Sequence, residues 1–164
     1  MDLVTQFDGT SVSDRWQAFD VTYDDESLDL PFGDFPSMFL THNPVFNVRA
    51  VQALRSVLST NGELLPLRSD SEEYFAFNVT TLVDALSARE SDLVYYPTSR
   101  IMAVRKYVLD LKQLRSQPIF KLPETARMDV FVSDEFVGIV ESHGLHGFLL
   151  SKSDLPEEIS APPF

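Results

Sequence analysis

The stretch "VFVSDEFVGIVESHGLHGF", residues 130–148, constrains the fold more than any other part of this sequence. It begins with β-branched and aromatic residues that favour a strand, and Ser133 then suits the N-cap of a helix. Apolar residues recur at helical spacing as far as Val140, and Gly144 fits the left-handed position that ends many helices. We therefore expect a short strand, then a helix, then a second strand that begins at "FLLS".

Two histidines, His143 and His146, lie at the end of that predicted helix. A helical metal site needs ligands three or four residues apart on a continuous helix, together with a third ligand. Gly144 separates the two rings, the chain has no cysteine, and the remaining histidine, His42, is distant in the sequence. We interpret both histidines as helix-end or surface residues, and we predict no metal and no cofactor.

Two further helices are predicted upstream. The first runs from Asn43–Pro44, which suit an N-cap and a first helical position, to the helix-ending Asn61–Gly62. Its apolar residues recur at spacings of three, on one helical face. The second, short helix is predicted over residues 82–91, with Thr80 or Thr81 as its cap.

Strand patterns lie between and after these helices. They are expected over residues 15–23, 63–67, 72–79, 100–111, 118–122 and 129–132. The longest, "RIMAVRKYVLDL", has apolar residues on both faces, which is typical of a central strand covered on both sides. Because strands and helices are interleaved without a regular βαβ rhythm, we predict a single α+β domain. It would hold a mostly antiparallel or mixed sheet and about three helices.

Composition divides the chain into three parts. Residues 1–43 form an acidic, aromatic N-terminal segment that we expect to pack on the domain. Residues 44–152 would form the core of the α+β domain, and residues 153–164 a loosely held tail. The single tryptophan, Trp16, is interpreted as a packing residue.

Charge limits the kinds of partner. The chain has 13 Lys and Arg against 25 Asp and Glu, a formal net charge of −12. Such a chain repels nucleic-acid phosphates and anionic lipid, so we expect neither nucleic acid nor membrane as a partner. No signal peptide and no membrane-spanning apolar run is recognisable, and a cytoplasmic protein is the expectation.

The sequence offers little catalytic chemistry. It contains no G-x-S-x-G, Walker loop, G-x-G-x-x-G or H-E-x-x-H motif, and the lack of cysteine excludes thiol nucleophiles. Paired acids such as Glu72–Glu73 are typical of solvated surface in so acidic a chain. A non-enzymatic binding protein is therefore expected. The alternatives are a small hydrolase or transferase with an unrecognised site, and a structural or regulatory domain that self-associates through its 13 phenylalanines.

Several segments, taken in order, resemble a family of bacterial immunity proteins from polymorphic toxin systems, formerly a domain of unknown function. They are "NVRAVQALRSVLSTNGELLPL", "EEYFAFNVTTLVDALSARESD", "RIMAVRKYVLDL" and "IFKLPETARMDVFVSDEFVGIVESHGLHGFLL". The resemblance extends over residues 45–150 and departs from the family pattern at Ser87, where an acidic residue is usual. It implies a non-enzymatic protein that binds and neutralises a cognate toxin encoded by an adjacent gene.

A binding face is predicted in the acidic N-terminal segment. If the toxin is a basic nuclease, an acidic face could cover its substrate cleft and accelerate encounter, with aromatic residues as apolar anchors. The residues of this face are Asp20, Tyr23, Asp24, Asp25, Glu26, Asp29, Phe32, Asp34 and Phe35. The alternative interpretation is that these acids only solvate a loop.

Overall fold

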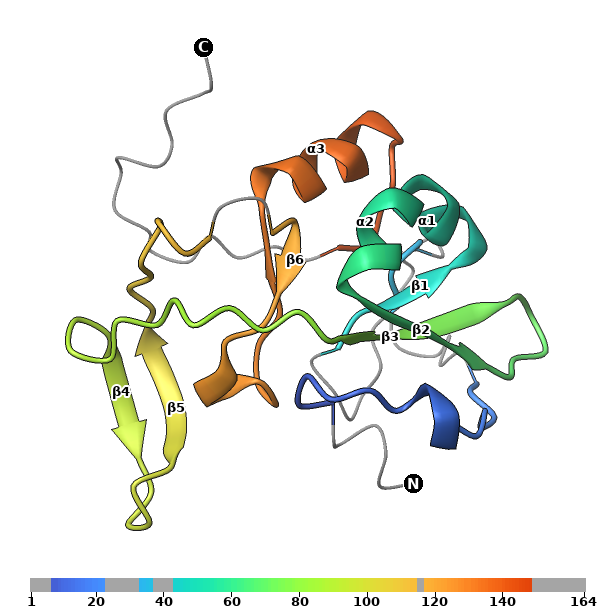
Figure 1. Cartoon of the computed structure of the whole chain (residues 1–164). Coiled ribbons are helices and arrows are strands. Elements are labelled where there is room, and N and C mark those ends of the chain that lie inside the picture. The colour runs from blue at the N-terminus through green and yellow to red at the C-terminus, as the bar shows by residue number, and fades with distance from the viewer. Residues whose placement is uncertain (1–6, 23–32, 37–42, 115–116, 149–164) are drawn as a thin grey trace.

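The computed structural model describes residues 7–22, 33–36, 43–114 and 117–148 (Figure 1). The strands in these ranges are β1 (Val45–Asn47), β2 (Gly62–Leu67), β3 (Tyr74–Val79), β4 (Asp92–Tyr95), β5 (Ile101–Lys106), β6 (Ile119–Phe120) and β7 (Phe131–Val132). The helices are η2 (Ser13–Arg15), α1 (Val48–Ala53), α2 (Arg55–Asn61), η3 (Pro123–Thr125) and α3 (Asp134–Ser142), where η denotes a 3-10 helix. The α+β prediction, with its three α-helices, is confirmed. None of the helices in these ranges is long and apolar enough to cross a membrane.

A three-stranded antiparallel sheet with the order β1-β3-β2 organises the core. Five of the six residues of its central strand, β3, are buried. Alternate side chains of a strand point to opposite faces, and β3 uses both. Phe77 and Val79 pack in the cluster formed with α1, α2 and α3, whereas Tyr74 and Ala76 pack in the cluster formed with the N-terminal segment. Both faces of this sheet are therefore covered.

The first predicted helix begins later than its sequence pattern indicated. The predicted cap at Asn43 and first turn at Pro44 are wrong, because the residues of β1 pair with β3 and keep the backbone extended. Asn47 is the N-cap, and its side chain accepts a hydrogen bond from the Ala50 N–H at 2.9 Å. Two short helices, α1 and α2, replace the single predicted one, and α2 ends at Asn61 as expected.

Residues 7–22 lie against the sheet face opposite the helices. Trp16 packs in this cluster and donates its indole N–H to the carbonyl oxygen of Pro66 at 2.9 Å, which confirms it as a packing residue. The strand expected around Trp16 is reduced to an isolated bridge between Asp20 and Arg68. Residues 7–22 are thus held to the sheet by side-chain packing more than by strand pairing.

The helix predicted over residues 82–91 does not form, and that prediction is wrong. Leu82 and Leu86 instead make isolated bridges with Lys121 and Leu109. Backbone groups in this stretch bond to distant segments of the chain. Since those long-range bonds satisfy the backbone, the local helical preference is overridden.

The prediction of a central strand over residues 100–111 is also wrong. β5 is shorter than predicted and pairs only with β4, in an antiparallel hairpin. This hairpin projects from one end of the molecule, away from the β1-β3-β2 sheet (Figure 1). Its apolar residues are only partly buried, because no third strand covers them among the residues described.

The C-terminal elements follow the sequence closely. β6 pairs with β7, and the Ser133 side chain caps α3 by accepting a hydrogen bond from the Phe136 N–H. Gly144 has a φ of +56°, and the following Leu145 N–H donates to the carbonyl oxygen of Val140 at 3.0 Å. The predicted strand, helix and glycine end are confirmed. Most of the final predicted strand lies outside the described residues.

Candidate functional site

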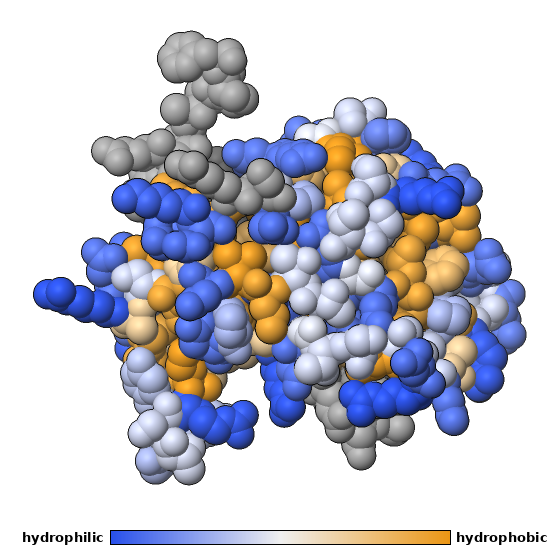
Figure 2. Space-filling view, viewed as in Figure 1, coloured by the Kyte–Doolittle hydropathy of each residue, from blue (hydrophilic) through white to orange (hydrophobic). Residues whose placement is uncertain are grey.

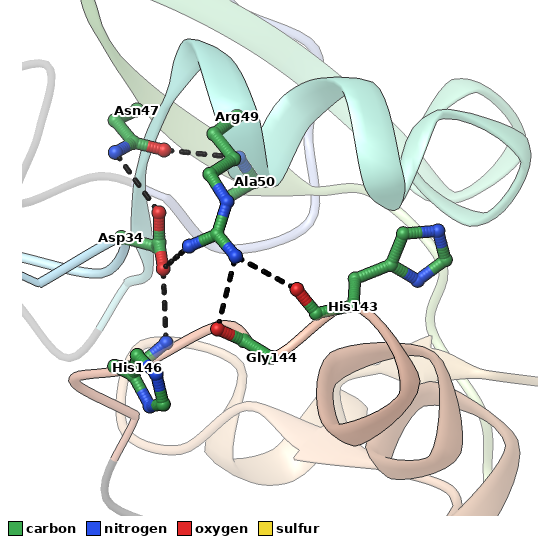
Figure 3. Close-up of polar contacts among 7 residues, drawn as sticks. All are labelled: Asp34, Asn47, Arg49, Ala50, His143, Gly144 and His146. Atoms are coloured by element: carbon green, nitrogen blue, oxygen red, sulfur yellow. Dashed lines mark hydrogen bonds and ion pairs between the residues drawn. The ribbon is translucent and has the colours of Figure 1, made fainter.

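The two C-terminal histidines point in different directions at the end of α3 (Figure 3). His143 is the C-cap residue, and its Nδ1 lies 2.9 Å from the carbonyl oxygen of Ile139. His146 contributes its backbone N–H, which donates to Asp34 Oδ2 at 2.9 Å. His143 thus lies at the helix end and His146 in the turn beyond Gly144, as predicted. Within the described ranges, no three His, Asp or Glu side chains are grouped so as to hold a metal ion.

Asp34 is the centre of a polar cluster between the N-terminal segment and two helices (Figure 3). Its carboxylate, in a residue that is only 6% exposed, accepts from Arg49 Nη1 at 2.8 Å and from Asn47 Nδ2 at 3.2 Å. Burial by itself would raise the pKa of Asp34. The hydrogen bonds from His146 and Asn47 and the charge of Arg49 outweigh it, and together they hold the pKa below its usual value.

Arg49 extends this cluster to the end of α3. Its Nη2 donates to the carbonyl oxygens of His143 at 2.8 Å and Gly144 at 3.0 Å. The last carbonyl groups of a helix lack partners within the helix and carry partial negative charge. The guanidinium therefore caps α3 while it neutralises Asp34. The cluster holds the N-terminal segment, α1 and the end of α3 together.

Glu63 of β2 fastens a second part of the N-terminal segment. Its carboxylate accepts hydrogen bonds from the Ser11 hydroxyl, the Val12 N–H at 2.9 Å and the Asn78 side-chain amide at 2.9 Å. Burial alone would raise the pKa of Glu63, but these bonds, with a weaker one from Ser13, outweigh it and lower the pKa to about 2. The Glu63 carboxylate thus holds Ser11 and Val12 against the sheet.

Lys121 is the one fully buried ammonium group among the described residues, with 1% of its surface exposed. Burial lowers its pKa to about 8, the kind of shift that catalytic lysines show. Its Nζ, however, donates to the carbonyl oxygen of Phe7 at 2.6 Å and to Asn43 Oδ1 at 2.7 Å. A side chain this enclosed cannot reach a substrate in solution, so we interpret it as a tie for the N-terminal segment.

The structure describes three of the nine residues of the predicted acidic face. Asp20 is exposed and pairs with Arg68, with Arg68 Nε 2.8 Å from Asp20 Oδ1. Asp34 is buried in the cluster above, and Phe35 is 7% exposed within the core. Asp34 and Phe35 therefore serve the fold. The others, Tyr23, Asp24, Asp25, Glu26, Asp29 and Phe32, lie outside the described residues.

A different surface stands out on the β4–β5 hairpin. Of the five large hydrophobic side chains that are exposed in the described part of the chain, three belong to it. They are Tyr95 (51%), Tyr96 (49%) and Met102 (43%). Together with the exposed Arg100 and Arg105 they form what we call the hairpin surface. Figure 2 shows hydrophobic residues reaching the surface over this hairpin.

The turn that joins the two strands has a defined geometry. The Tyr96 N–H donates to the carbonyl oxygen of Arg100 at 2.8 Å, and the Ser99 N–H donates to that of Tyr96 at 3.0 Å. Ser99 has a φ of +63°, the only non-glycine residue with a positive φ among those described. Polar residues such as serine do adopt this conformation in tight turns, although glycine is preferred. The turn thus presents Tyr96 and Arg100 side by side in one backbone arrangement.

A cavity of about 650 Å³ lies beside the hairpin. From the hairpin it is lined by Tyr95, Arg100 and Ile101, and from the η3 region by residues 123–128. Arg127 on its wall is paired with Asp8, with Arg127 Nη2 3.1 Å from Asp8 Oδ2. The cavity is open to solvent, and its lining mixes apolar with charged side chains.

Sequence reasoning missed the hairpin surface. It expected a helix over residues 82–91 and a strand covered on both faces over residues 100–111. A signal was present in "YYPTSR", residues 95–100, where a proline, a threonine and a serine between apolar runs favour a turn. Two adjacent tyrosines before such a turn place large amphipathic side chains on an exposed loop.

Comparison with known proteins identifies a family whose model spans the hairpin. The model of the Imm11 immunity protein family matches residues 65–153, which include the hairpin, the η3 region and α3. The match overlaps the segments on which the family resemblance rests. No curated protein matches the sequence. Because the family model covers more than half of its 164 residues, this chain belongs to the Imm11 immunity protein family.

Proposed function

We propose that this protein binds and neutralises a cognate bacterial toxin encoded by an adjacent gene, and that it catalyses no reaction itself. The family assignment supports an immunity role. The observation that carries the proposal is the gathering of Tyr95, Tyr96 and Met102, each about half exposed, on one projecting hairpin. Tyrosine and methionine are enriched where proteins bind one another, and such side chains gain stability when a partner covers them.

A protein that neutralises a toxin by binding it needs high affinity for the toxin and no catalytic residues. An immunity protein of this kind would sequester the toxin stoichiometrically in the cytoplasm, so that the free toxin concentration is set by the dissociation constant. The described polar clusters agree with this mode, because Asp34, Glu63 and Lys121 are each engaged in holding the chain together.

The acidic N-terminal segment is a second proposed contact, supported by its charge. Residues 1–35 contain nine Asp and Glu residues and a single basic residue, Arg15. Exposed carboxylates there would attract a basic toxin and accelerate encounter at low ionic strength. Asp14 and Asp20 are the exposed members that the structure describes.

Co-expression tests the proposed function. The toxin gene next to that of this chain is induced in a susceptible bacterium, with and without the tagged chain, and survival and co-purification are both measured. We expect survival only when the tagged chain is present, together with a complex that persists through purification. A toxin that kills regardless, and that the tagged chain does not retain, would contradict the proposal.

A charge-reversal triple variant tests the acidic segment. Asp24→Lys, Asp25→Lys and Glu26→Lys together should weaken toxin binding and its dependence on ionic strength without unfolding the chain. The matched control reverses three exposed acids elsewhere, Asp70, Glu73 and Glu141, with the same change in net charge. Equal affinities of the two triple variants for the toxin would remove the segment from the interface.

A further inference from the structure

The hairpin surface carries positive charge on a strongly acidic chain. Between Asp92 and Lys106, the hairpin has three cationic side chains, Arg100, Arg105 and Lys106, against the single carboxylate of Asp92. The chain as a whole has a net charge of −12. The hairpin is therefore a local cationic region whose sign is opposite to that of the rest of the molecule.

These cations have no carboxylate partner within the described part of the chain. The ion pairs found there are Arg49–Asp34, Arg68–Asp20 and Arg127–Asp8, and none of them involves the hairpin. Arg100, Arg105 and Lys106 are all exposed. Their charges are thus available to a partner.

The cavity beside the hairpin also has one paired and one unpaired arginine in its lining, among the residues described. On the η3 side, Arg127 is already neutralised by Asp8. On the hairpin side, Arg100 lines the cavity together with Tyr95, and it forms no ion pair with Glu124, the carboxylate that η3 contributes to the lining. An incoming carboxylate would therefore find its available cation at the hairpin.

We infer that the hairpin surface binds an acidic patch on the toxin, in which carboxylates pair with Arg100 and Arg105 and an apolar contact covers Tyr95 and Tyr96. This inference rests on the proposed function and names the chemistry of the partner. Arginine and tyrosine are among the residue types enriched at positions that dominate binding energy, and arginine can pair with a carboxylate through two parallel hydrogen bonds.

Two properties of the hairpin favour a protein surface as its occupant. A nucleic acid is disfavoured because the charge of −12 on the chain repels phosphates at longer range. The turn is held by its own backbone hydrogen bonds, so that little conformational freedom is lost on binding. Since the hairpin also projects from the body, it is shaped to enter a concave, acidic site (Figure 1).

The test reverses the charge of the hairpin in the full-length chain. Binding of the toxin to Arg100→Glu/Arg105→Glu is measured by calorimetry or surface immobilisation at several salt concentrations. The control is Arg55→Glu/Lys112→Glu, which changes the net charge equally at two exposed basic residues outside the hairpin and the N-terminal segment. We expect the hairpin variant to bind at least about tenfold more weakly and with less dependence on salt, and the control to stay within about twofold.

A third variant tests the apolar contact. Tyr95→Ala/Tyr96→Ala should also weaken binding about tenfold, but with the salt dependence of the unmodified chain retained. Circular dichroism and urea denaturation establish that each variant is folded. If Arg100→Glu/Arg105→Glu is not folded, Arg100→Gln/Arg105→Gln replaces it, with the same expected direction.

The outcomes separate this inference from the proposed function. If the unmodified chain binds and neutralises the toxin and the hairpin variants do so equally well, the inference is overturned and the proposed function stands. If the unmodified chain does not bind the toxin, both fall. If light scattering shows a salt-sensitive dimer that the hairpin variant loses, while toxin binding is unchanged, the surface belongs to self-association and the inference is overturned.

Discussion

Arg49 Nη1 lies 2.8 Å from Asp34 Oδ2. This ion pair joins the N-terminal segment to the core domain, two parts of the chain that composition alone divides. Asp34 belongs to the acidic N-terminal segment, and Arg49 to the first turn of α1. The same guanidinium donates to the carbonyl oxygens of His143 and Gly144 at the end of α3. One side chain therefore holds three segments together, which explains why Asp34 is not part of an exposed acidic face.

Replacing Arg49 should destabilise the fold. Arg49→Ala leaves the carboxylate of Asp34, whose side chain is 8% exposed, without its cation, and leaves the end of α3 uncapped. Because the arginine itself is about half exposed, we expect a loss of about 1–2 kcal/mol in the free energy of unfolding, measured with urea. Arg68→Ala is the control, since the Arg68–Asp20 pair is exposed on both sides and its loss should cost clearly less stability than the loss of Arg49. Equal losses would contradict a structural role for the Asp34 cluster.

Two glycines should respond to alanine in opposite directions. A Cβ at Gly62 would lie 2.3 Å from the carbonyl oxygen of Asn78 in the paired strand, and backbone cannot move aside cheaply. We expect Gly62→Ala to cost about 1–3 kcal/mol of stability. In α3, a Cβ at Gly138 meets nothing within 4 Å, so Gly138→Ala should raise stability by about 0.5–1 kcal/mol through its higher helix propensity. Thermal and urea denaturation of the two variants provide the comparison, and a shift of the same sign in both would contradict it.

Glu63 should make the stability depend on acid pH. Its pKa is about 2 in the folded chain and near 4.5 when unperturbed, so between these values the unfolded chain binds more protons. The stabilisation is therefore present above about pH 4.5 and is lost as the pH falls towards 2. Glu63→Gln removes this contribution. The gap in urea midpoint between the unmodified chain and the variant should be widest near neutral pH and should narrow below pH 4.5. A gap that stays constant with pH would show that the charge of Glu63 is not what holds the N-terminal segment.

Loss of Lys121 should loosen residues 7–22 before the rest of the chain. Lys121→Met keeps an apolar stem in the buried site but removes the donor to the Phe7 carbonyl oxygen. We expect a loss of about 1–3 kcal/mol and faster hydrogen exchange at the amides of residues 7–16. The exposed Lys112 supplies the control, and Lys112→Met should leave both quantities unchanged. Uniform acceleration across all amides would indicate general destabilisation without a specific tie.

The best predictions from sequence concern the stretch from Val130 to Leu145. Its strand, its serine cap and its glycine end depend on residues within a few positions of one another. Caps, helical periodicity and the left-handed glycine are local interactions, and so they can be read from the order of residues. The same reason explains why β2 and β3 were located closely and why the histidines were assigned to the helix end.

The predictions that failed depended on partners distant in the sequence. Asn43–Pro44 has the chemistry of a helix start, yet pairing of β1 with β3 moves the cap to Asn47. Residues 82–91 are helical by pattern, yet bridges to Leu109 and Lys121 supply their backbone bonds. Neither partner is visible from the local sequence.

The sequence by itself determined the α+β composition, the acidic balance, the absence of cysteine and the family segments that indicate an immunity protein. Only the tertiary structure decided which charged side chains form buried interactions that stabilise the fold and which remain exposed on the surface. It buries Asp34 against Arg49 and leaves Arg100, Tyr95 and Tyr96 exposed on a projecting hairpin. The physical reason is that a charged or aromatic side chain is buried or exposed according to the residues that pack against it. Those residues come from distant parts of the chain, so the local sequence does not show them.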